Sequence, residues 1–332
     1  MYSLHQAHRS ICIGRFLGRR LMEPDLPKQS GTAESISMPK KGIEMIRECQ
    51  PGISLFAVGL IALGALSVIY RDFAYTWQPV PAFHPGRDVL AIACGLFMIG
   101  AGVALFFRAT VSVAVRAVFA FLLAWMCLPI PYLIAMPQRE GRWLGSGEIA
   151  MLLAGGWVLF AHLSGLDKTG FFSHITGAKG VRIARIVFGL AVLPVGLSHI
   201  FYTKITASLV PPWLPFRTGL AYLTGFGQIA CGLAILFSIW PRMAALIETG
   251  MLGLFAFLVW GPDTWFAVTP KMPGAPPGFR FPLTAFLITW VIGASALLVA
   301  SDGAAKAVEL FNFDRDRGTR ADPEESPKVA SR

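Results

Sequence analysis

Residues 210–236 read VPPWLPFRTGLAYLTGFGQIACGLAIL, and they align without a gap on residues 80–106, VPAFHPGRDVLAIACGLFMIGAGVALF. Ten of the 27 aligned positions are identical, whereas a composition of this kind gives about three identities by chance. The identical positions are Val80, Pro81, Pro85, Arg87, Leu90, Ala91, Gly95, Ile99, Gly102 and Ala104. A shift of 130 residues therefore relates two halves of the chain, which predicts an internal repeat.

The sequence on both sides of this repeat is too apolar for a soluble domain. Of the 332 residues, 55% are hydrophobic and 14% are charged, and the mean hydropathy is +0.59. Apolar runs of roughly 18 to 24 residues are long enough to cross about 30 Å of hydrocarbon as helices. Such runs lie at about 53–70, 89–108, 111–134, 147–165, 183–202, 218–240, 243–260 and 282–300. We therefore predict an all-α integral membrane protein of eight transmembrane helices, arranged as two parallel four-helix repeats.

The orientation in the membrane follows from the lysines and arginines near the span ends, because basic loops resist translocation. Thirteen of them fall on the side of the N-terminus and eight on the opposite side. This bias predicts that both termini are cytoplasmic and that the repeated proline-rich loop faces outward. The net charge of +10 then reflects topology and attraction to anionic lipid, and not nucleic-acid binding.

The spans divide the chain into five expected regions. These are a polar basic N-terminal tail (1–50), a first membrane repeat (51–165), a cytoplasmic linker (166–182), a second membrane repeat (183–301) and a disordered C-terminal tail (302–332). The N-terminal tail has neither an uninterrupted apolar run nor a small-residue cleavage site, so we expect no cleavable signal peptide. Three methionines, Met1, Met38 and Met45, are alternative starts of the chain.

The pattern V-P-x-[FW]-x-P-x-R follows the first span of each half. Its prolines and arginines include Pro81, Arg87, Pro211, Pro215 and Arg217. Proline removes backbone donors, so this segment must lie at the interface or be covered by protein. Trp213 suits the headgroup boundary, and the arginines can meet phosphates or cap the preceding turn. Two interpretations remain open, an interfacial loop that sets how two helices meet and the mouth of a ligand site.

Three polar side chains lie within predicted spans of the second half: His199, Gln228 and Glu248. Polar groups in a membrane cost free energy, so each needs a reason. Their repeat counterparts are apolar, namely Val68 or Ile69 for His199, Met98 for Gln228 and Val118 for Glu248. This asymmetry indicates a site in the second half. The alternative is structural, with His199 reaching interfacial water and the other two bonding neighbouring helices.

Two other charged residues have simpler interpretations. Glu148 opens the predicted fourth span at the outer surface, where a carboxylate stabilises the positive end of the helix dipole. Arg116 lies at a depth similar to that of Glu248, which permits an ion pair between the halves. His162 and His199 stand about 24 Å apart in depth, at 1.5 Å per helical residue, so they cannot ligate one haem together. The five cysteines form no C-x-x-C pair, and no metal-binding or nucleotide-binding motif is present.

The stretch from 196 to 260, GLSHIFYTKITASLVPPWLPFRTGLAYLTGFGQIACGLAILFSIWPRMAALIETGMLGLFAFLVW, resembles the DoxX-like family of four-span membrane proteins. The resembling features are the opening helix with Gly and His, the VPPxLP-type loop and the glycine-rich helix that follows it. Gln228 stands where members of the family often carry an acidic residue. The resemblance covers the second half of the chain and reaches the first half only through the internal repeat.

The family takes its name from subunits of a thiosulfate:quinone oxidoreductase, so the resemblance implies a quinone-associated subunit of a membrane oxidoreductase complex in the bacterial inner membrane. His199 or Gln228 would hydrogen-bond a quinone oxygen, with Glu248, Arg217 and Trp213 as further candidate ligand contacts. The chain has no flavin, haem or iron–sulfur motif, so a partner subunit would carry the electrons. The alternative is a non-enzymatic scaffold or carrier for a lipid or small solute. Catalytic residues and oligomeric state are not predicted.

Overall fold

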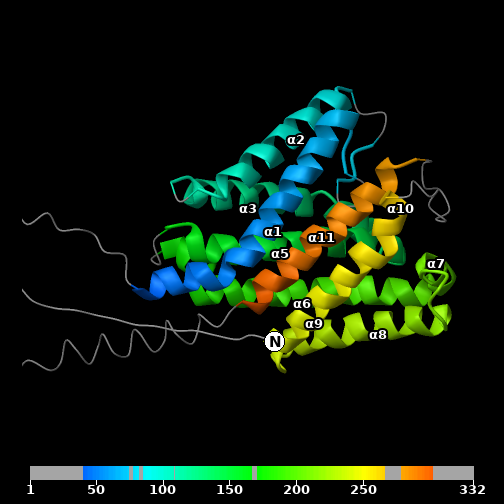
Figure 1. The fold of residues 1–332 in the computed structure, drawn as a ribbon. Coiled ribbons are helices and arrows are strands. Elements are labelled where there is room, and N and C mark those ends of the chain that lie inside the picture. Colours follow the sequence, from blue (N-terminus) through cyan, green and yellow to red (C-terminus); the bar gives the residue numbers. More distant parts are fainter. Residues whose placement is uncertain are drawn as a thin grey trace, which may run out of the picture. The chain divides into compact units, whose positions relative to one another are not determined.

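The computed structural model describes residues 40–74, 78–81, 85–107, 109–166, 170–265 and 278–301, with the backbone alone for 40–50 and Phe171. The expected C-terminal tail, most of the expected N-terminal tail, and Phe83 of the first loop lie outside the described residues. Every regular element in the described part is a helix (Figure 1). The helices of the first half are α1 (Lys40–Tyr70), α2 (Arg87–Ala104), α3 (Val111–Cys127), α4 (Ile130–Ala135) and α5 (Glu140–Leu163). Those that follow are η1 (Gly170–His174), α6 (Gly177–Phe201), α7 (Thr203–Leu209), α8 (Arg217–Leu236), α9 (Pro241–Leu254), η2 (Phe255–Trp260), α10 (Gly261–Trp265) and α11 (Arg280–Ala300).

Eight helical segments among the described residues are long and apolar enough to cross a membrane. The third of them continues from α3 through α4, and the seventh runs from α9 through η2 and α10. The prediction of an all-α, eight-span membrane protein is therefore confirmed. The cytoplasmic placement of the termini and the tandem repeat stay predictions from the sequence.

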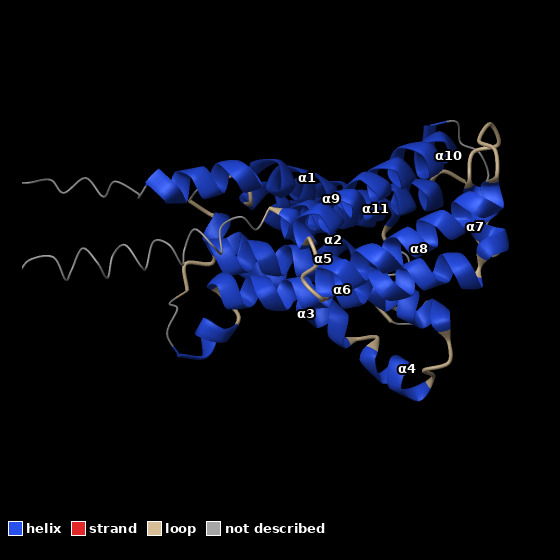
Figure 2. Ribbon diagram, turned by 90° about the horizontal axis from the view of Figure 1, so that it is seen from below, coloured by secondary structure: helices blue, strands red, loops and turns tan. Residues whose placement is uncertain are grey.

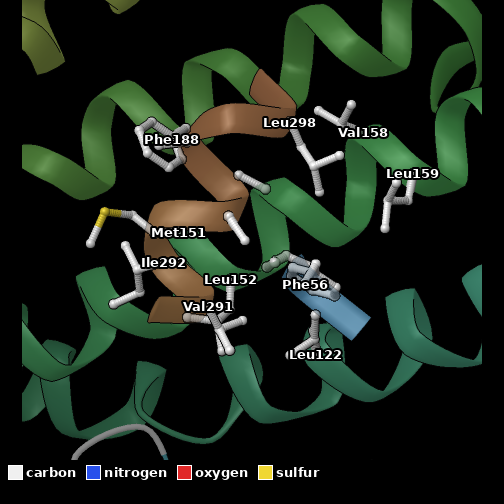
Figure 3. Close-up of a cluster of buried hydrophobic side chains, with 14 of the residues drawn as sticks. Phe56, Leu122, Met151, Leu152, Val158, Leu159, Phe188, Val291, Ile292 and Leu298 are labelled. Carbon is white, nitrogen blue, oxygen red and sulfur yellow. The ribbon is translucent and has the colours of Figure 1, made fainter. Parts of the chain in front are cut away.

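The centre of the bundle is formed by α5 and α11, which cross each other and carry the largest share of buried residues (Figure 3). A Cβ added to Gly155 of α5 would lie 2.4 Å from Oγ of Ser295 on α11. Small residues at this crossing let the two backbones approach closely, as is typical of helix packing in membranes. Around the crossing, Phe56 of α1, Leu122 of α3 and Phe188 of α6 are buried against the central pair.

Two helix pairs pack through glycine in the same way, α1 on α2 and α6 on α8. A Cβ on Gly64 would lie 2.5 Å from the carbonyl oxygen of Gly95, and a Cβ on Gly196 would lie 2.7 Å from that of Gly225. Lipid supplies no hydrophobic driving force between helices, so this close contact is what holds each pair together. The two pairs thus share one packing geometry.

Two helices begin earlier than hydropathy suggested. The fourth span starts at Glu140 instead of about 147, because the charged residues of its first turns hide them from an apolar pattern. The fifth span, α6, starts at Gly177, within the stretch expected to be a linker. Glu148 therefore lies two turns inside α5, and the expectation that it opens the helix is wrong.

The short helices α4, α7 and α10 lie at one end of the bundle, which we call the α7 end (Figure 2). At this end α6 finishes at Phe201, and α8 and α11 begin at Arg217 and Arg280. The topology predicted from charge places the α7 end outside the cell. The loop at 210–216 lies here, between α7 and α8.

Candidate functional site

A cavity of about 370 Å³ lies at the α7 end among α5, α6, α7, α8, α9, η2 and α11, and we call it the main cavity. Its volume falls in the range of about 300 to 1,000 Å³ that is usual for small-molecule sites. Most of its wall is apolar. The polar and aromatic residues on the wall are Glu148, Ser198, His199, Tyr202, Thr206, Gln228, Phe255, Trp260, Phe281, Thr284 and Thr289.

Gln228, near the middle of α8, is one of the lining residues of the main cavity. Nε2 of Gln228 donates a hydrogen bond to Oε1 of Glu248 on α9, at 3.2 Å. Both side chains are buried, with exposed fractions of 1% and 0%. Oε1 of Gln228 and Oε2 of Glu248 have no hydrogen-bond partner in the structure. The pair therefore joins α8 to α9, as the structural interpretation from the sequence expected, and it leaves one oxygen of each side chain without a partner in the protein.

His199 occupies the wall of the cavity one helix away, on α6. Its Nδ1 lies 2.9 Å from Oγ1 of Thr224 on α8, and its ring packs against the ring of Phe255 with centroids 5.6 Å apart. These two contacts hold the imidazole in place from both sides. His199 is therefore a positioned polar group within an otherwise apolar wall.

A second, mostly apolar cavity of about 240 Å³ lies under the proline-rich loop, and we call it the loop cavity. Leu209, Val210, Pro211 and Leu214 line it from the loop side. His199, Phe255 and Trp260 line both cavities, so the two share one wall. Leu254, which is 59% exposed on the apolar surface of α9, also borders the loop cavity. This cavity therefore reaches the face of the bundle that contacts lipid.

The seventh span changes from α-helix to π-helix at Phe255–Trp260, beside both cavities. Short π-helical segments are rare, and they occur frequently at functional sites because the wider turn redirects side chains. Phe255 and Trp260, which line both cavities, are the first and last residues of this segment. No feature of the sequence signalled it.

Glu148 of α5 and Tyr202, which directly follows α6, also line the main cavity. Burial raises the pKa of the Tyr202 phenol above its ordinary value, and the nearby Glu140 carboxyl raises it further. The Tyr202 hydroxyl is therefore protonated at neutral pH. Glu148 faces the cavity and not the helix terminus, which is a consequence of the earlier start of α5.

The corresponding place in the first half is filled. A Cβ added to Gly225 would contact the Cβ of His199, and a Cβ added to Gly95 would contact the Cβ of Ser67. Under the predicted repeat, these glycine contacts align His199 with Ser67, in place of the Val68 or Ile69 expected from the sequence. Only about 10 Å³ remains open next to Ser67, where Phe73 packs edge-to-face on Trp125.

The residues of the proline-rich loop differ in their burial and in whether they line a cavity. Pro211 is buried and lines the loop cavity, whereas Trp213, Pro215 and Arg217 are exposed and lie outside both cavities. For Arg217 no hydrogen bond or ion pair is recorded with any described residue. The loop is thus a cover over the loop cavity, and its tryptophan and arginine face away from it.

The matching loop in the first half, around Val80 and Arg87, is attached to the bundle through its arginine. Arg87 forms an ion pair with Asp72, and its Nε donates to the carbonyl oxygen of Val80 at 3.3 Å. Asp72 also binds Arg280 of α11, with N and O 2.8 Å apart. Pro81 is exposed beside this cluster. Asp72, which follows α1, therefore joins Arg87 of α2 to Arg280 of α11.

The ion pair considered between Arg116 and Glu248 does not form. The guanidinium of Arg116 donates from Nε to the carbonyl oxygen of Ser164 at 2.8 Å, at the end of α5, and Glu248 bonds Gln228 instead. No group of three or more His, Cys, Asp or Glu side chains that could hold a metal ion occurs in the described part of the chain.

Of the candidate ligand contacts from the sequence, the structure brings His199 and Gln228 to one cavity, with Glu248 directly behind Gln228. Arg217 and Trp213 are not part of this group. Sequence reasoning missed Thr224, because a threonine in an apolar helix is common and carries no signal by itself. It also missed the α11 wall with Thr284, since contacts between distant spans cannot be read from a single sequence.

Comparison with known proteins identifies one family. Residues 180–261, from α6 to the first residue of α10, match the DoxX family model, so the resemblance is confirmed for the second half of the chain. This segment holds His199, Gln228, Glu248 and the π-helix, whereas the α5 and α11 walls of the main cavity lie outside it. No curated protein and no solved structure matches the chain.

Proposed function

We propose that the protein binds a quinone-type lipid in the main cavity and serves as the quinone-associated subunit of a membrane oxidoreductase. The observation that carries this proposal is the pair of neighbouring cavities with common wall residues: the main cavity, which has polar groups on a mostly apolar wall, for a ring with oxygen substituents, and the loop cavity for a hydrocarbon tail. Both share the wall of His199, Phe255 and Trp260.

The chemistry of the walls suits such a ligand. A quinone has a flat ring that packs well against aromatic side chains, and Phe255 and Trp260 offer such surfaces. Its oxygens need hydrogen-bond partners at fixed places, and His199 and Gln228 lie on the wall. The exposed Leu254 at the border of the loop cavity gives the tail a route to the bilayer.

A partner protein is part of this proposal, because the sequence has no haem, flavin or iron–sulfur motif and the electrons must pass to or from another subunit. The alternative is a carrier for another lipid or small solute, and it would use the same cavities. A carrier usually has polar groups in both halves around a central axis. The filled site beside Ser67 favours the one-sided binding subunit.

The test is the lipid content of the protein purified in mild detergent, measured by extraction and mass spectrometry. Ala285 of α11 lines the main cavity, so Ala285→Leu places three further carbons in it. Ala93 of α2 is exposed on the apolar surface, and Ala93→Leu is the matched control. We expect quinone to co-purify with the wild type and with Ala93→Leu, and to be reduced in Ala285→Leu.

Equal quinone content in all three proteins would contradict the proposed site. A different lipid, lost in Ala285→Leu and kept in Ala93→Leu, would replace the quinone proposal with the carrier. Proteins that co-purify with the wild type address the second part of the proposal. A redox-active subunit among them is the expected result, and their absence from mildly solubilised native membranes would argue against a complex.

A further inference from the structure

The amide of Gln228 has a defined direction. Its Nε2 is used by the carboxyl group of Glu248, so the carbonyl oxygen Oε1 is left as the free group of this side chain. An amide oxygen accepts hydrogen bonds and cannot donate them. Oε1 has no hydrogen-bond partner in the protein, and Gln228 borders the main cavity, so a ligand in this cavity is the candidate partner for this oxygen.

The ring of His199 has a defined direction as well. The single hydroxyl hydrogen of Thr224 is committed to its own helix, where Oγ1 donates to the carbonyl oxygen of Leu220 at 2.9 Å. In that arrangement the contact between Oγ1 and Nδ1 of His199 takes its hydrogen from the ring, because the hydroxyl has a single hydrogen. In the neutral imidazole the other nitrogen, Nε2, then carries the lone pair and is an acceptor.

Other hydroxyls of the wall also offer lone pairs in place of hydrogens. Ser198 donates to the carbonyl oxygen of Val195 at 2.7 Å, and Thr284 donates to that of Arg280 at 2.8 Å. The hydroxyl of Thr289 can rotate to donate or accept. The Tyr202 hydroxyl and the indole N–H of Trp260 are donors on the same wall. Gln228 and His199 are the two groups whose direction is set by a contact with another side chain, and in these arrangements both are acceptors.

We propose that the main cavity recognises its ligand through donated hydroxyl hydrogens, so that it binds a hydroquinone in preference to the corresponding quinone. This inference rests on the proposed function for the class of ligand. A quinone carbonyl can only accept, so it would face Oε1 of Gln228 with a second lone pair and leave that oxygen unsatisfied. A hydroquinone hydroxyl supplies the missing hydrogen, and a site built to accept it discriminates against an analogue that lacks it.

The test is equilibrium binding to the detergent-purified protein under anaerobic conditions, with three ligands that share one ring and one decyl tail. They are a benzoquinone, its hydroquinone, and the dimethyl ether of the hydroquinone, which keeps the oxygens and loses both hydrogens. We expect the hydroquinone to bind at least about tenfold more tightly than the other two, the effect of one hydrogen bond.

Two pairs of variants locate the discrimination. Gln228→Met, which installs the residue aligned with it in the first half, removes one of the two acceptors and is expected to lower the ratio of hydroquinone to quinone affinity. Glu248→Gln still accepts from Nε2 of Gln228, so the ratio should be kept. Likewise, Thr224→Val should reduce the ratio, and Thr224→Ser should preserve it.

The outcomes separate the two proposals. If all three ligands bind with similar affinity to the wild type, or the quinone binds best, the preference for a hydroquinone is wrong and the proposed function stands. If none of the three binds, the proposed function is wrong and the inference falls with it. The ratio of hydroquinone to quinone affinity in the wild type alone decides whether the preference exists, so the test holds even where a variant fails to fold.

Discussion

Replacing Gln228 by Leu removes the hydrogen bond that Glu248 receives, while keeping the size of the side chain. Glu248 is fully buried, and the amide of Gln228 at 3.2 Å is its recorded hydrogen-bond donor. Leaving a buried polar group without its hydrogen-bond partner costs about 1 to 3 kcal/mol. We therefore expect Gln228→Leu to lower the free energy of unfolding by about 2 kcal/mol or more.

A double-mutant cycle gives the sharper test. Glu248→Leu alone leaves the Gln228 amide without its acceptor, and the double variant removes both polar groups at once. Replacing both partners by apolar groups of similar shape is close to neutral. The double variant should therefore lose about 1 to 2 kcal/mol less unfolding free energy than the two single variants lose together.

The assay is reversible unfolding in mixed micelles with an increasing fraction of denaturing detergent. Met98→Leu, at the related depth of the first half, is the control and should cost less than about 1.5 kcal/mol because the volume is conserved. If the losses of the two single variants add within about 0.5 kcal/mol, the two side chains do not interact and the reasoning about this pair is refuted.

Three further predictions concern stability and use the same unfolding assay. Gly196→Ala should destabilise by about 1 to 3 kcal/mol because the new Cβ would lie 2.7 Å from a carbonyl oxygen of α8, whereas Gly250→Ala, with nothing within 4 Å, should be neutral or stabilising; equal effects would argue against the close helix contact. Phe216→Gly should stabilise by about 1 kcal/mol, since Phe216 precedes α8 with φ 52° and is 87% exposed, and a loss of stability would mean that its ring anchors the loop. Asp72→Asn should cost about 1 to 3 kcal/mol, because it removes the shared partner of two arginines; an unchanged midpoint would show that this cluster is not structural.

The eight spans could be predicted from the sequence because a membrane imposes a simple rule, that every span must satisfy its own backbone and present apolar side chains. The rule is weakest where a span begins with charged residues. Glu140 and Arg142 hid the first turns of α5, and this error moved Glu148 from the cavity to a helix end.

The candidate site was predicted in part. Gln228 and Glu248 stand out as polar residues in apolar runs, and they do meet. That they bond each other depends on the rotation of α8 against α9, which a single sequence does not contain. The same holds for the counterpart of His199, because the glycine contacts that shift the alignment to Ser67 are visible only once α1 and α2 are packed. The π-helix at Phe255–Trp260 has no sequence signature at all.

The central claim, that a quinone-type ligand occupies the main cavity, is tested most directly by photoaffinity labelling with an azido-substituted quinone, followed by peptide mapping. The account predicts labelled residues on α6, η2 and α11 around His199, Phe255 and Ile288, and loss of this label when an excess of unlabelled hydroquinone is present. Labels spread over the apolar surfaces of both halves, and insensitive to competition, would contradict it.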